Sequence, residues 1–142
     1  MHNYIFHFSL FIFHFNLLTM KILGNIIWLI FGGIVTSIEY AISSVLLMVT
    51  IIGIPFGLQT LKLAMLALWP FGSKVTDNGS SSGGCLNVIM NILWLFLGGF
   101  CICLTHLFFG ILLCITIIGI PFGRQHFKMA GLSLTPFGKT IS

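Results

Sequence analysis

The chain has 142 residues, of which 58% are hydrophobic and only 6% are charged, and its mean hydropathy is +1.14. A soluble domain carries about 25% charged residues, and so few charges could not cover a water-facing surface. The composition therefore excludes an ordinary soluble protein and indicates an integral membrane protein.

Charged residues are mostly basic, with two acids against six bases and a formal net charge of +4. The bases are Lys21, Lys62, Lys74, Arg124, Lys128 and Lys139, and the acids are Glu39 and Asp77. A nucleic-acid-binding protein would need a dense basic patch interleaved with polar or stacking residues, which this sequence lacks. The positive balance suits a lipid bilayer with anionic headgroups, which we expect to be the partner.

The first 19 residues differ from the rest of the chain. They are apolar but lack the basic start and the small-residue cleavage site of a signal peptide. The three histidines among them are irregularly spaced, so we expect no metal site there. Because Met20 and Lys21 follow directly, we treat residues 1–20 as an N-terminal extension and expect Met20 to be the natural start.

The remainder of the chain contains an internal repeat. Shifting the sequence by 66 positions aligns residues 25–75 with residues 91–141 without a gap. Both copies carry N-I-x-W-L-x-x-G-G, then T-I-I-G-I-P-F-G-x-Q-x-x-K-x-A, and finally P-F-G. Glycine, proline, glutamine and lysine match as well as the apolar residues, which chance similarity would not produce. The sequence predicts two tandem membrane repeats, at residues 21–75 and 91–142.

A flexible linker is expected between the two copies. Residues 76–90 include D-N-G-S-S-S-G-G, a run without apolar periodicity. This composition is typical of a solvated, flexible chain. We therefore expect the linker to lie outside the membrane.

The apolar stretch of each repeat is too long for one straight span. From Ile22 to Leu58 the only charged residue is Glu39, and a straight helix of this length would measure about 55 Å. The hydrocarbon core is about 30 Å thick. Two solutions compete: one long span kinked at Gly32-Gly33, or two short spans with a turn near Ser37 to Tyr40.

The basic residues favour the second solution, because lysine and arginine collect on the cytoplasmic side of a membrane protein. Lys21 precedes the first apolar stretch, while Lys62 and Lys74 follow it, and two crossings would place all three on one side. We therefore expect two transmembrane hairpins, four spans in all, with the linker and the C-terminus in the cytoplasm.

The segment Gly-Ile-Pro-Phe-Gly should end one helix and start another, because proline lacks a donor and glycine weakens helices. The restarted segments, 58–69 and 124–135, are too short to span. Their polar residues gather on one side, which predicts amphipathic helices in the headgroup plane. The expected fold is an all-α integral membrane protein with two tandem repeats, each a short helical transmembrane hairpin plus an interfacial amphipathic helix.

These motifs resemble those of the YccF-type family of bacterial inner-membrane proteins. The likeness rests on I-I-G-I-P-F-G-x-Q-x-x-K-x-A followed by L-x-P-F-G, which occur twice, and it extends from about Lys21 to Ile141. The resemblance implies a small multi-pass protein of the bacterial inner membrane. It implies no established catalytic or transport activity, so it assigns no active site.

Glu39 is the first candidate for a functional residue, since it is the only acid in the apolar region. An ionisable group inside a membrane is costly and usually functional, for example as a proton or cation site. The alternative is a hairpin turn in water, which the repeat favours because the matching residue is Thr105. His106, which aligns with Tyr40, is open to the same two interpretations.

The two Gly-Ile-Pro-Phe-Gly breaks, at Pro55 and Pro121, are the second candidate. Paired helix breaks can hold ions or substrates in transporters, although here they could simply turn the chain into an interfacial helix. Lys62 and Lys128 occupy matching positions. We expect them to contact lipid phosphate, with an anionic substrate as the alternative.

Enzyme chemistry finds no support, because the sequence contains neither a carboxylate pair, a Ser/His/Asp set, a phosphate-binding loop nor HExxH. We expect no cofactor and no metal. The leading hypothesis is a non-enzymatic accessory or scaffold of the inner membrane, and the alternative is a small ion or solute transporter. Small residues spaced four apart, as at Gly33 and Ser37, are also compatible with a homo-oligomer.

Overall fold

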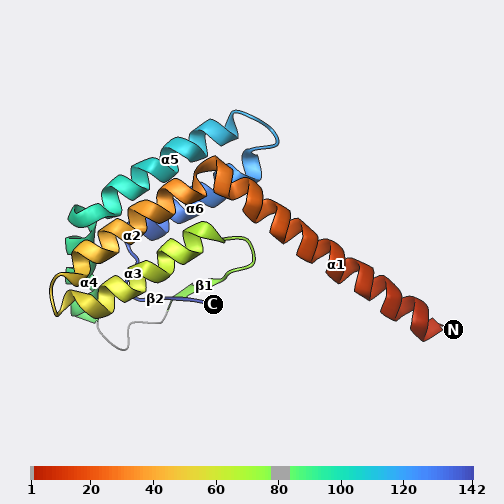
Figure 1. The fold of residues 1–142 in the computed structure, drawn as a ribbon, viewed down its shortest axis with the longest axis horizontal. Helices are drawn as coiled ribbons and strands as arrows, with labels where there is room; N and C mark the ends of the chain where they lie inside the picture. The colour runs from red at the N-terminus through yellow and green to blue at the C-terminus, as the bar shows by residue number, and fades with distance from the viewer. Residues whose placement is uncertain (1, 78–83) are drawn as a thin grey trace.

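The computed structural model describes residues 2–77 and 84–142, with side chains from Asn3 onward. Within these residues the fold is helical apart from one short ribbon of two strands. Each repeat contributes the same succession of elements: a helix, a π-helical bend, two further helices and a strand (Figure 1). The repeat seen in the sequence is therefore also a repeat of structure.

The two copies have closely similar bounds. The first comprises α1 (His2–Trp28), the bend η1 (Leu29–Gly33), α2 (Ile34–Met48), α3 (Gly53–Leu68) and β1 (Val75–Asp77). The second comprises α4 (Gly84–Trp94), the bend η2 (Leu95–Gly99), α5 (Phe100–Cys114), α6 (Ile120–Leu134) and β2 (Lys139–Ile141).

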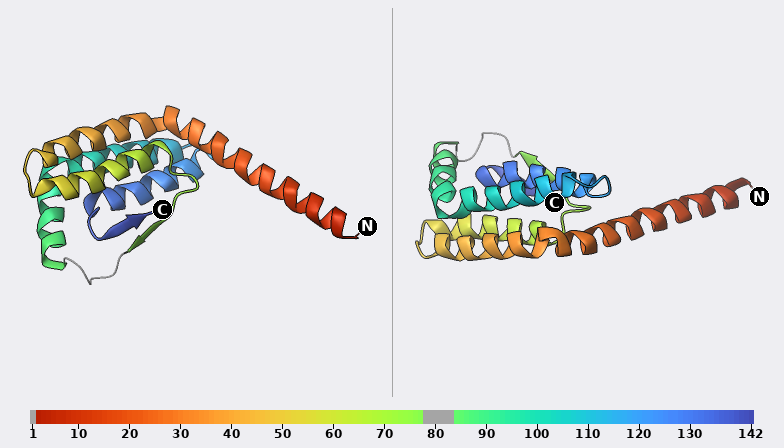
Figure 2. Two further views of the ribbon diagram at one scale, coloured as in Figure 1. Left: turned by 60° about the horizontal axis from the view of Figure 1, so that its bottom comes forward. Right: turned by 90° about the horizontal axis from the view of Figure 1, so that it is seen from above.

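Two helical hairpins form the body of the protein. Helix α2 packs along α3, and α5 packs along α6. The two hairpins lie side by side and point in opposite directions, so that their turns lie at opposite ends of the bundle (Figures 1 and 2). The N-terminal part of α1 projects away from this bundle, and its side chains up to Leu23 are exposed.

The ribbon joins the ends of the two repeats. Strands β1 and β2 are antiparallel, with Val75 opposite Ile141 and Asp77 opposite Lys139. The pairing continues one residue further, where the amide of Lys74 donates to the carbonyl of Ser142 over 2.6 Å. The ribbon therefore holds the end of the first repeat and the C-terminus on the same side of the bundle.

An approximate two-fold axis relates the two copies. The hydroxyl of Thr105 donates to Oε1 of Glu39 over 2.8 Å, and these residues are 66 positions apart, which is the offset of the repeat. Val75 and Ile141, which pair in the ribbon, have the same offset. Corresponding residues meet only where the axis between two copies passes. The axis thus runs from the crossing of α2 and α5 to the ribbon.

A kink is present at Gly32-Gly33, which the sequence offered only as the alternative to the favoured turn near Ser37 to Tyr40. Gly32 has a φ of +116°, and a Cβ atom there would lie 2.8 Å from the ring of Phe109 on α5. Only glycine adopts this backbone conformation without strain, and only glycine leaves room for the ring. The matching Gly98 is packed against Ser43 of α2, so glycine lets the two copies approach closely at both bends.

The turn that was expected near Ser37 to Tyr40 is wrong, because these residues lie in the middle of α2. The hydroxyl of Ser37 donates to the carbonyl of Ala64 on α3 over 2.8 Å, and that of Thr36 donates to the carbonyl of Gly32 over 3.0 Å. Because these polar side chains form their hydrogen bonds inside the bundle, they do not need to lie at a turn that is exposed to water.

The Gly-Ile-Pro-Phe-Gly segments do end one helix and begin another, as expected. Helix α2 ends at Met48 and α3 begins at Gly53, whose amide donates to the hydroxyl of Thr50 over 3.1 Å. Pro55 lies in the first turn of α3, where a missing amide hydrogen costs nothing. The restarted helices α3 and α6 form the second arms of the hairpins, because one face of each is buried against α2 or α5.

One other expectation needs correction. Residues 84–90, which were assigned to the linker, are helical and belong to α4. Of the rest of the linker, residues 76 and 77 lie in β1 and residues 78–83 lie outside the described residues. The described part of the expected N-terminal extension lies in α1, which runs without interruption into the first repeat.

Two helical stretches are long and apolar enough to cross a membrane, Asn3–Met48 and Gly84–Cys114. Each combines the two helices on either side of a bend. Helix α3, at Gly53–Leu68, is apolar but shorter. These two stretches, found among the described residues, differ from the four short spans that were expected.

An asparagine closes each repeat. The side-chain amide of Asn25 donates to the carbonyl of Phe71 and its oxygen accepts from the amide of Phe71, both over 2.9 Å. Asn91 makes the same two bonds to Phe137, over 3.3 and 3.0 Å. These bonds satisfy the backbone of the P-F-G turn inside the protein. They explain why asparagine and P-F-G occur together in both copies.

Replacing either asparagine by alanine should destabilise the protein by a similar amount. Each change leaves a donor and an acceptor of the turn unpaired, which costs about 1–3 kcal/mol. Unfolding by heat or by SDS in detergent micelles measures the effect for N25A and N91A. Asn87, one turn before Asn91, makes no such bridge, and N87A is the matched control; a loss as large in N87A would contradict the prediction.

Replacing Gly32 by alanine should be more damaging than the same change at Gly131. At Gly32 the left-handed backbone and the overlap with Phe109 together cost about 2–4 kcal/mol. A Cβ atom at Gly131, in α6, would meet nothing within 4 Å. There alanine should stabilise the helix by about 0.5–1 kcal/mol. The melting temperatures of the two variants in detergent measure this difference. Equal shifts in melting temperature would contradict the left-handed backbone conformation and close packing described at Gly32.

Candidate functional site at the crossing of the two repeats

The candidate site lies where α2 and α5 cross at the two-fold axis. Glu39 of α2 accepts a hydrogen bond from Thr105 of α5. The next residue on each helix forms a second layer, in which the rings of Tyr40 and His106 are 6.2 Å apart and both fully buried. The crossing thus consists of two consecutive pairs of corresponding residues.

A second histidine lies behind the first. Nδ1 of His106 is 2.9 Å from Nδ1 of His126, which α6 contributes. Nε2 of His126 is 3.0 Å from the backbone carbonyl oxygen of Phe31. Both imidazoles have no exposed surface. The carbonyl of Phe31 is available because Phe31 and Gly32 leave the helical conformation at the bend.

Trp28 supports this pair. Its indole stacks on the ring of His126, with the centroids 4.0 Å apart and the planes inclined by 26°. The indole Nε1 donates to the carbonyl of Ala67 over 2.6 Å, which fixes the ring in place. The aromatic face is electron-rich, so a positive charge on His126 would be stabilised there.

Three polar side-chain atoms of the site are buried without a hydrogen-bond partner in the described part of the chain. They are Oε2 of Glu39, the hydroxyl of Tyr40 and Nε2 of His106. A buried polar atom that remains unpaired costs free energy, and such atoms in a native structure often have a role in binding or catalysis. These three atoms distinguish the crossing from the hydrogen-bonded polar side chains elsewhere in the bundle.

The two copies differ at this site although their backbones correspond. The first repeat carries Tyr40 and Thr60 where the second carries His106 and His126. In the first repeat the hydroxyl of Ser44 donates to that of Thr60 over 2.8 Å. The histidine pair therefore occurs in the second repeat and has no counterpart at the matching positions of the first.

The structure brings two of the predicted site residues together. Glu39 and His106 were considered separately from the sequence, but both lie at the crossing, through Thr105 and Tyr40 respectively. Pro55 and Pro121 lie in the first turns of α3 and α6 and are both exposed. Because these two helices begin at opposite ends of the bundle (Figure 2), the two helix breaks do not meet within the chain.

Lys62 and Lys128 occupy equivalent exposed positions on α3 and α6. Lys62 lines a cavity of about 270 Å³ together with Trp69 and Ser73. Lys128 lines one of about 340 Å³ together with Asp77 and Lys139. The two cavities correspond under the two-fold axis, on either side of the ribbon.

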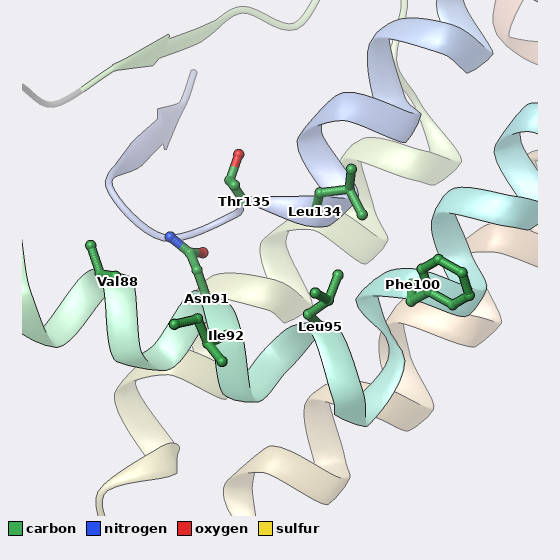
Figure 3. A pocket seen from close by; sticks show the side chains of 7 residues that line it. All are labelled: Val88, Asn91, Ile92, Leu95, Phe100, Leu134 and Thr135. Carbon is green, nitrogen blue, oxygen red and sulfur yellow. The ribbon is translucent and has the colours of Figure 1, made fainter.

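A larger cavity of about 500 Å³ lies between α4 and the end of α6 (Figure 3). Its lining is mostly apolar, and its one amide, that of Asn91, is already bonded to Phe137. Thr135 adds one hydroxyl to the lining, which contains no charged group. This apolar lining suits a hydrocarbon chain.

Sequence reasoning missed His126 and Trp28 as members of the site. Neither residue was among the candidates that the sequence analysis singled out. One signal was available: His126 replaces Thr60 in a motif that otherwise matches closely between the copies. A histidine that differs between repeats is a reason to look for asymmetric chemistry.

Among the described residues, no group of three or more His, Cys, Asp or Glu side chains could hold a metal ion. The chemistry that the site can perform follows from its two imidazoles, its carboxyl group and its hydroxyl groups. All of these can bind or pass a proton.

Comparison with known proteins identifies the family to which the two repeats are similar. The family model named YccF, described as "Inner membrane component domain", matches residues 23–73 and again residues 89–139. The second match begins 66 residues after the first, as the internal repeat does. The domain of this family therefore occurs twice in the chain.

Curated relatives agree with this match. The chain is 31% identical over 129 residues to the inner membrane protein YccF of Escherichia coli (strain K12), covering 86% of this chain and 87% of the relative. It is similar to the same extent to the inner membrane protein YccF of Shigella flexneri. No solved structure matches the chain. The family match and these relatives show that the chain belongs to the YccF family of inner-membrane proteins.

Proposed function

We propose that the chain is a non-enzymatic component of the bacterial inner membrane that binds anionic lipid headgroups on one basic face. The observation that carries this proposal is the pair of equivalent cavities, each lined by a lysine, on either side of the ribbon. The inner-membrane location rests on the family and on the names of its relatives.

One side of the bundle has to face hydrocarbon. The large exposed side chains of α2 and α5, between residues 34 and 46 and between residues 100 and 112, are all apolar. The hairpin turns carry Ile51 and Ile117, each 87% exposed. Such a surface is stable only in lipid.

The opposite side carries the basic residues. All of the lysines and arginines after Lys21 lie on α3, α6 or the ribbon and its flanks: Lys62, Lys74, Arg124, Lys128 and Lys139. A face with this charge is attracted to anionic headgroups. The two-fold axis runs from the apolar crossing to this face, so both repeats present their lysines to the same membrane surface.

The cavities suit the headgroup region. The first combines Lys62 with Trp69, an aromatic residue of the kind that is enriched at membrane interfaces. The second combines Lys128 with Lys139. A cavity of about 300 Å³ is comparable to the smallest ligand pockets of proteins. A lipid phosphate and part of its headgroup would fit there, with the acyl chains over the apolar helices.

The orientation follows from the same asymmetry. Because basic residues gather on the cytoplasmic side, the ribbon, the first residues of the linker and the C-terminus belong in the cytoplasm. Each repeat then enters the membrane through α1 or α4 and returns to the same side at its P-F-G turn. The crossing of α2 and α5 lies farthest from the cytoplasm.

Replacing Lys62 and Lys128 by alanine should weaken the binding of anionic lipid. A basic residue at an anionic surface contributes about 1 kcal/mol, so each change should lower the affinity about five-fold. Native mass spectrometry of protein released from nanodiscs of mixed phosphatidylglycerol and phosphatidylcholine counts the retained lipids. Retention of phosphatidylglycerol should fall, while that of phosphatidylcholine should not change.

Lys74 supplies the matched control, because it is exposed near the ribbon but lines neither of these two cavities. K74A should retain nearly as much phosphatidylglycerol as the unchanged protein, and arginine at positions 62 and 128 should restore the binding. If K74A lost as much lipid as the double variant, the attraction would be diffuse and the cavities would not be sites.

Cysteine labelling should confirm the orientation. In a chain whose four native cysteines are replaced, T76C on β1 should react with a water-soluble maleimide in inside-out vesicles but not in intact spheroplasts. I38C lies on the outer face of α2, where Ile38 is 54% exposed, and should react in neither because hydrocarbon covers it. Labelling of T76C from outside would reverse the orientation, and labelling of I38C would place that face in water.

A further inference from the structure

The hydrogen bonds of the two histidines define which nitrogen carries each hydrogen. The carbonyl of Phe31 can only accept, so Nε2 of His126 must be the donor across their 3.0 Å contact. A neutral His126 then has a lone pair at Nδ1. His106 must donate from its Nδ1 across the 2.9 Å contact, which leaves its Nε2 as a bare acceptor.

That bare acceptor is Nε2 of His106, which is buried and has no partner among the described residues. The arrangement of two neutral rings therefore ends in an unused basic nitrogen. We propose that the buried pair His106–His126 is a single-proton binding site of this membrane protein, with Nε2 of His106 as the atom that receives the proton.

The proton and charge balance is simple. A proton from the surroundings forms a new N–H bond at Nε2 of His106, which makes that ring an imidazolium. The hydrogen on Nδ1 of His106 then transfers to Nδ1 of His126. His106 becomes neutral again with its hydrogen on Nε2, and His126 carries the positive charge with hydrogens on both nitrogens. No electrons are transferred, and the bond to Phe31 is kept throughout.

The surroundings of His126 suit this charge. Its ring lies face to face with Trp28 at a centroid distance of 4.0 Å, and its Nε2–H points to the carbonyl oxygen of Phe31. A cation over an indole is stabilised, more so where water is excluded. The bend at Gly32 is what releases the Phe31 carbonyl from the helix.

A second proton does not fit. If both rings were charged, each Nδ1 would carry a hydrogen, and the 2.9 Å contact between them would become a repulsion. The other titratable groups nearby are Tyr40 and Glu39 on α2. The charged Arg124 and Lys128 of α6 and Lys62 of α3 are exposed on the outer faces of their helices.

The pair occurs in one repeat alone. The corresponding residues of the first repeat, Tyr40 and Thr60, provide hydroxyl groups that do not gain a proton near neutral pH. The matching bend η2 also keeps a helical backbone, whereas η1 does not. The asymmetric backbone and the asymmetric histidines thus coincide, which a purely structural packing role would not require.

Histidine ¹⁵N NMR of the full chain in lipid nanodiscs tests the proposal, with the three histidines at positions 2, 7 and 14 replaced by glutamine. Near neutral pH the spectrum should show hydrogen on Nδ1 of His106 and on Nε2 of His126, and lone pairs on the other two nitrogens. On acidification the folded protein should take up one proton, with both rings responding together.

Two variants take their residues from the first repeat, H126T and H106Y, and each leaves one histidine of the pair. Each should have at least about ten-fold lower proton affinity, since a charged hydrogen bond is roughly twice as strong as a neutral one and is lost here. Uptake of two protons in separate steps, unchanged affinity in either variant, or unfolding before any uptake would each overturn the proposal.

Discussion

Polar groups inside this bundle must find their hydrogen-bond partners within the protein, because hydrocarbon offers none. The residues shared by the two repeats meet this requirement. Asn25 binds both backbone groups of Phe71, and the indole of Trp28 donates to the carbonyl of Ala67. The same bonds recur from Asn91 and Trp94. Much of the duplicated motif therefore closes the turns of each unit. Among the described residues, the buried side-chain atoms that remain unpaired all lie at the crossing of α2 and α5.

The elements that the sequence predicts correctly are those with local causes. Charge depletion indicates lipid, and the proline segments mark where helices restart. The kink at Gly32-Gly33 was considered but not favoured. The predicted turn at Ser37 to Tyr40 failed because polarity was interpreted as contact with water. In the structure Ser37 donates to Ala64 of the neighbouring helix. A membrane sequence does not distinguish a serine that faces water from one that faces another helix, because both patterns look the same along the chain.

The site was predictable in part. Glu39 and His106 stand out as ionisable groups among apolar residues, but the sequence does not show that they lie at one crossing. That requires the two-fold axis, which places residues with an offset of 66 against each other, as Glu39 and Thr105 show. For His126 the sequence offers only the difference from Thr60 in the first repeat. Its contact with Phe31 joins residues 95 positions apart and depends on a distorted bend, so no sequence pattern predicts it.

The ribbon has a consequence for the order in which the protein folds. Its second strand, Lys139–Ile141, is synthesised after all the described helices, yet it pairs with β1 of the first repeat. Gln59 likewise donates to the carbonyl of Lys139, 80 residues later. Domains generally fold from the N-terminus as synthesis proceeds. Here the first repeat must wait in the membrane with an unpaired strand until the whole of the second repeat has been synthesised.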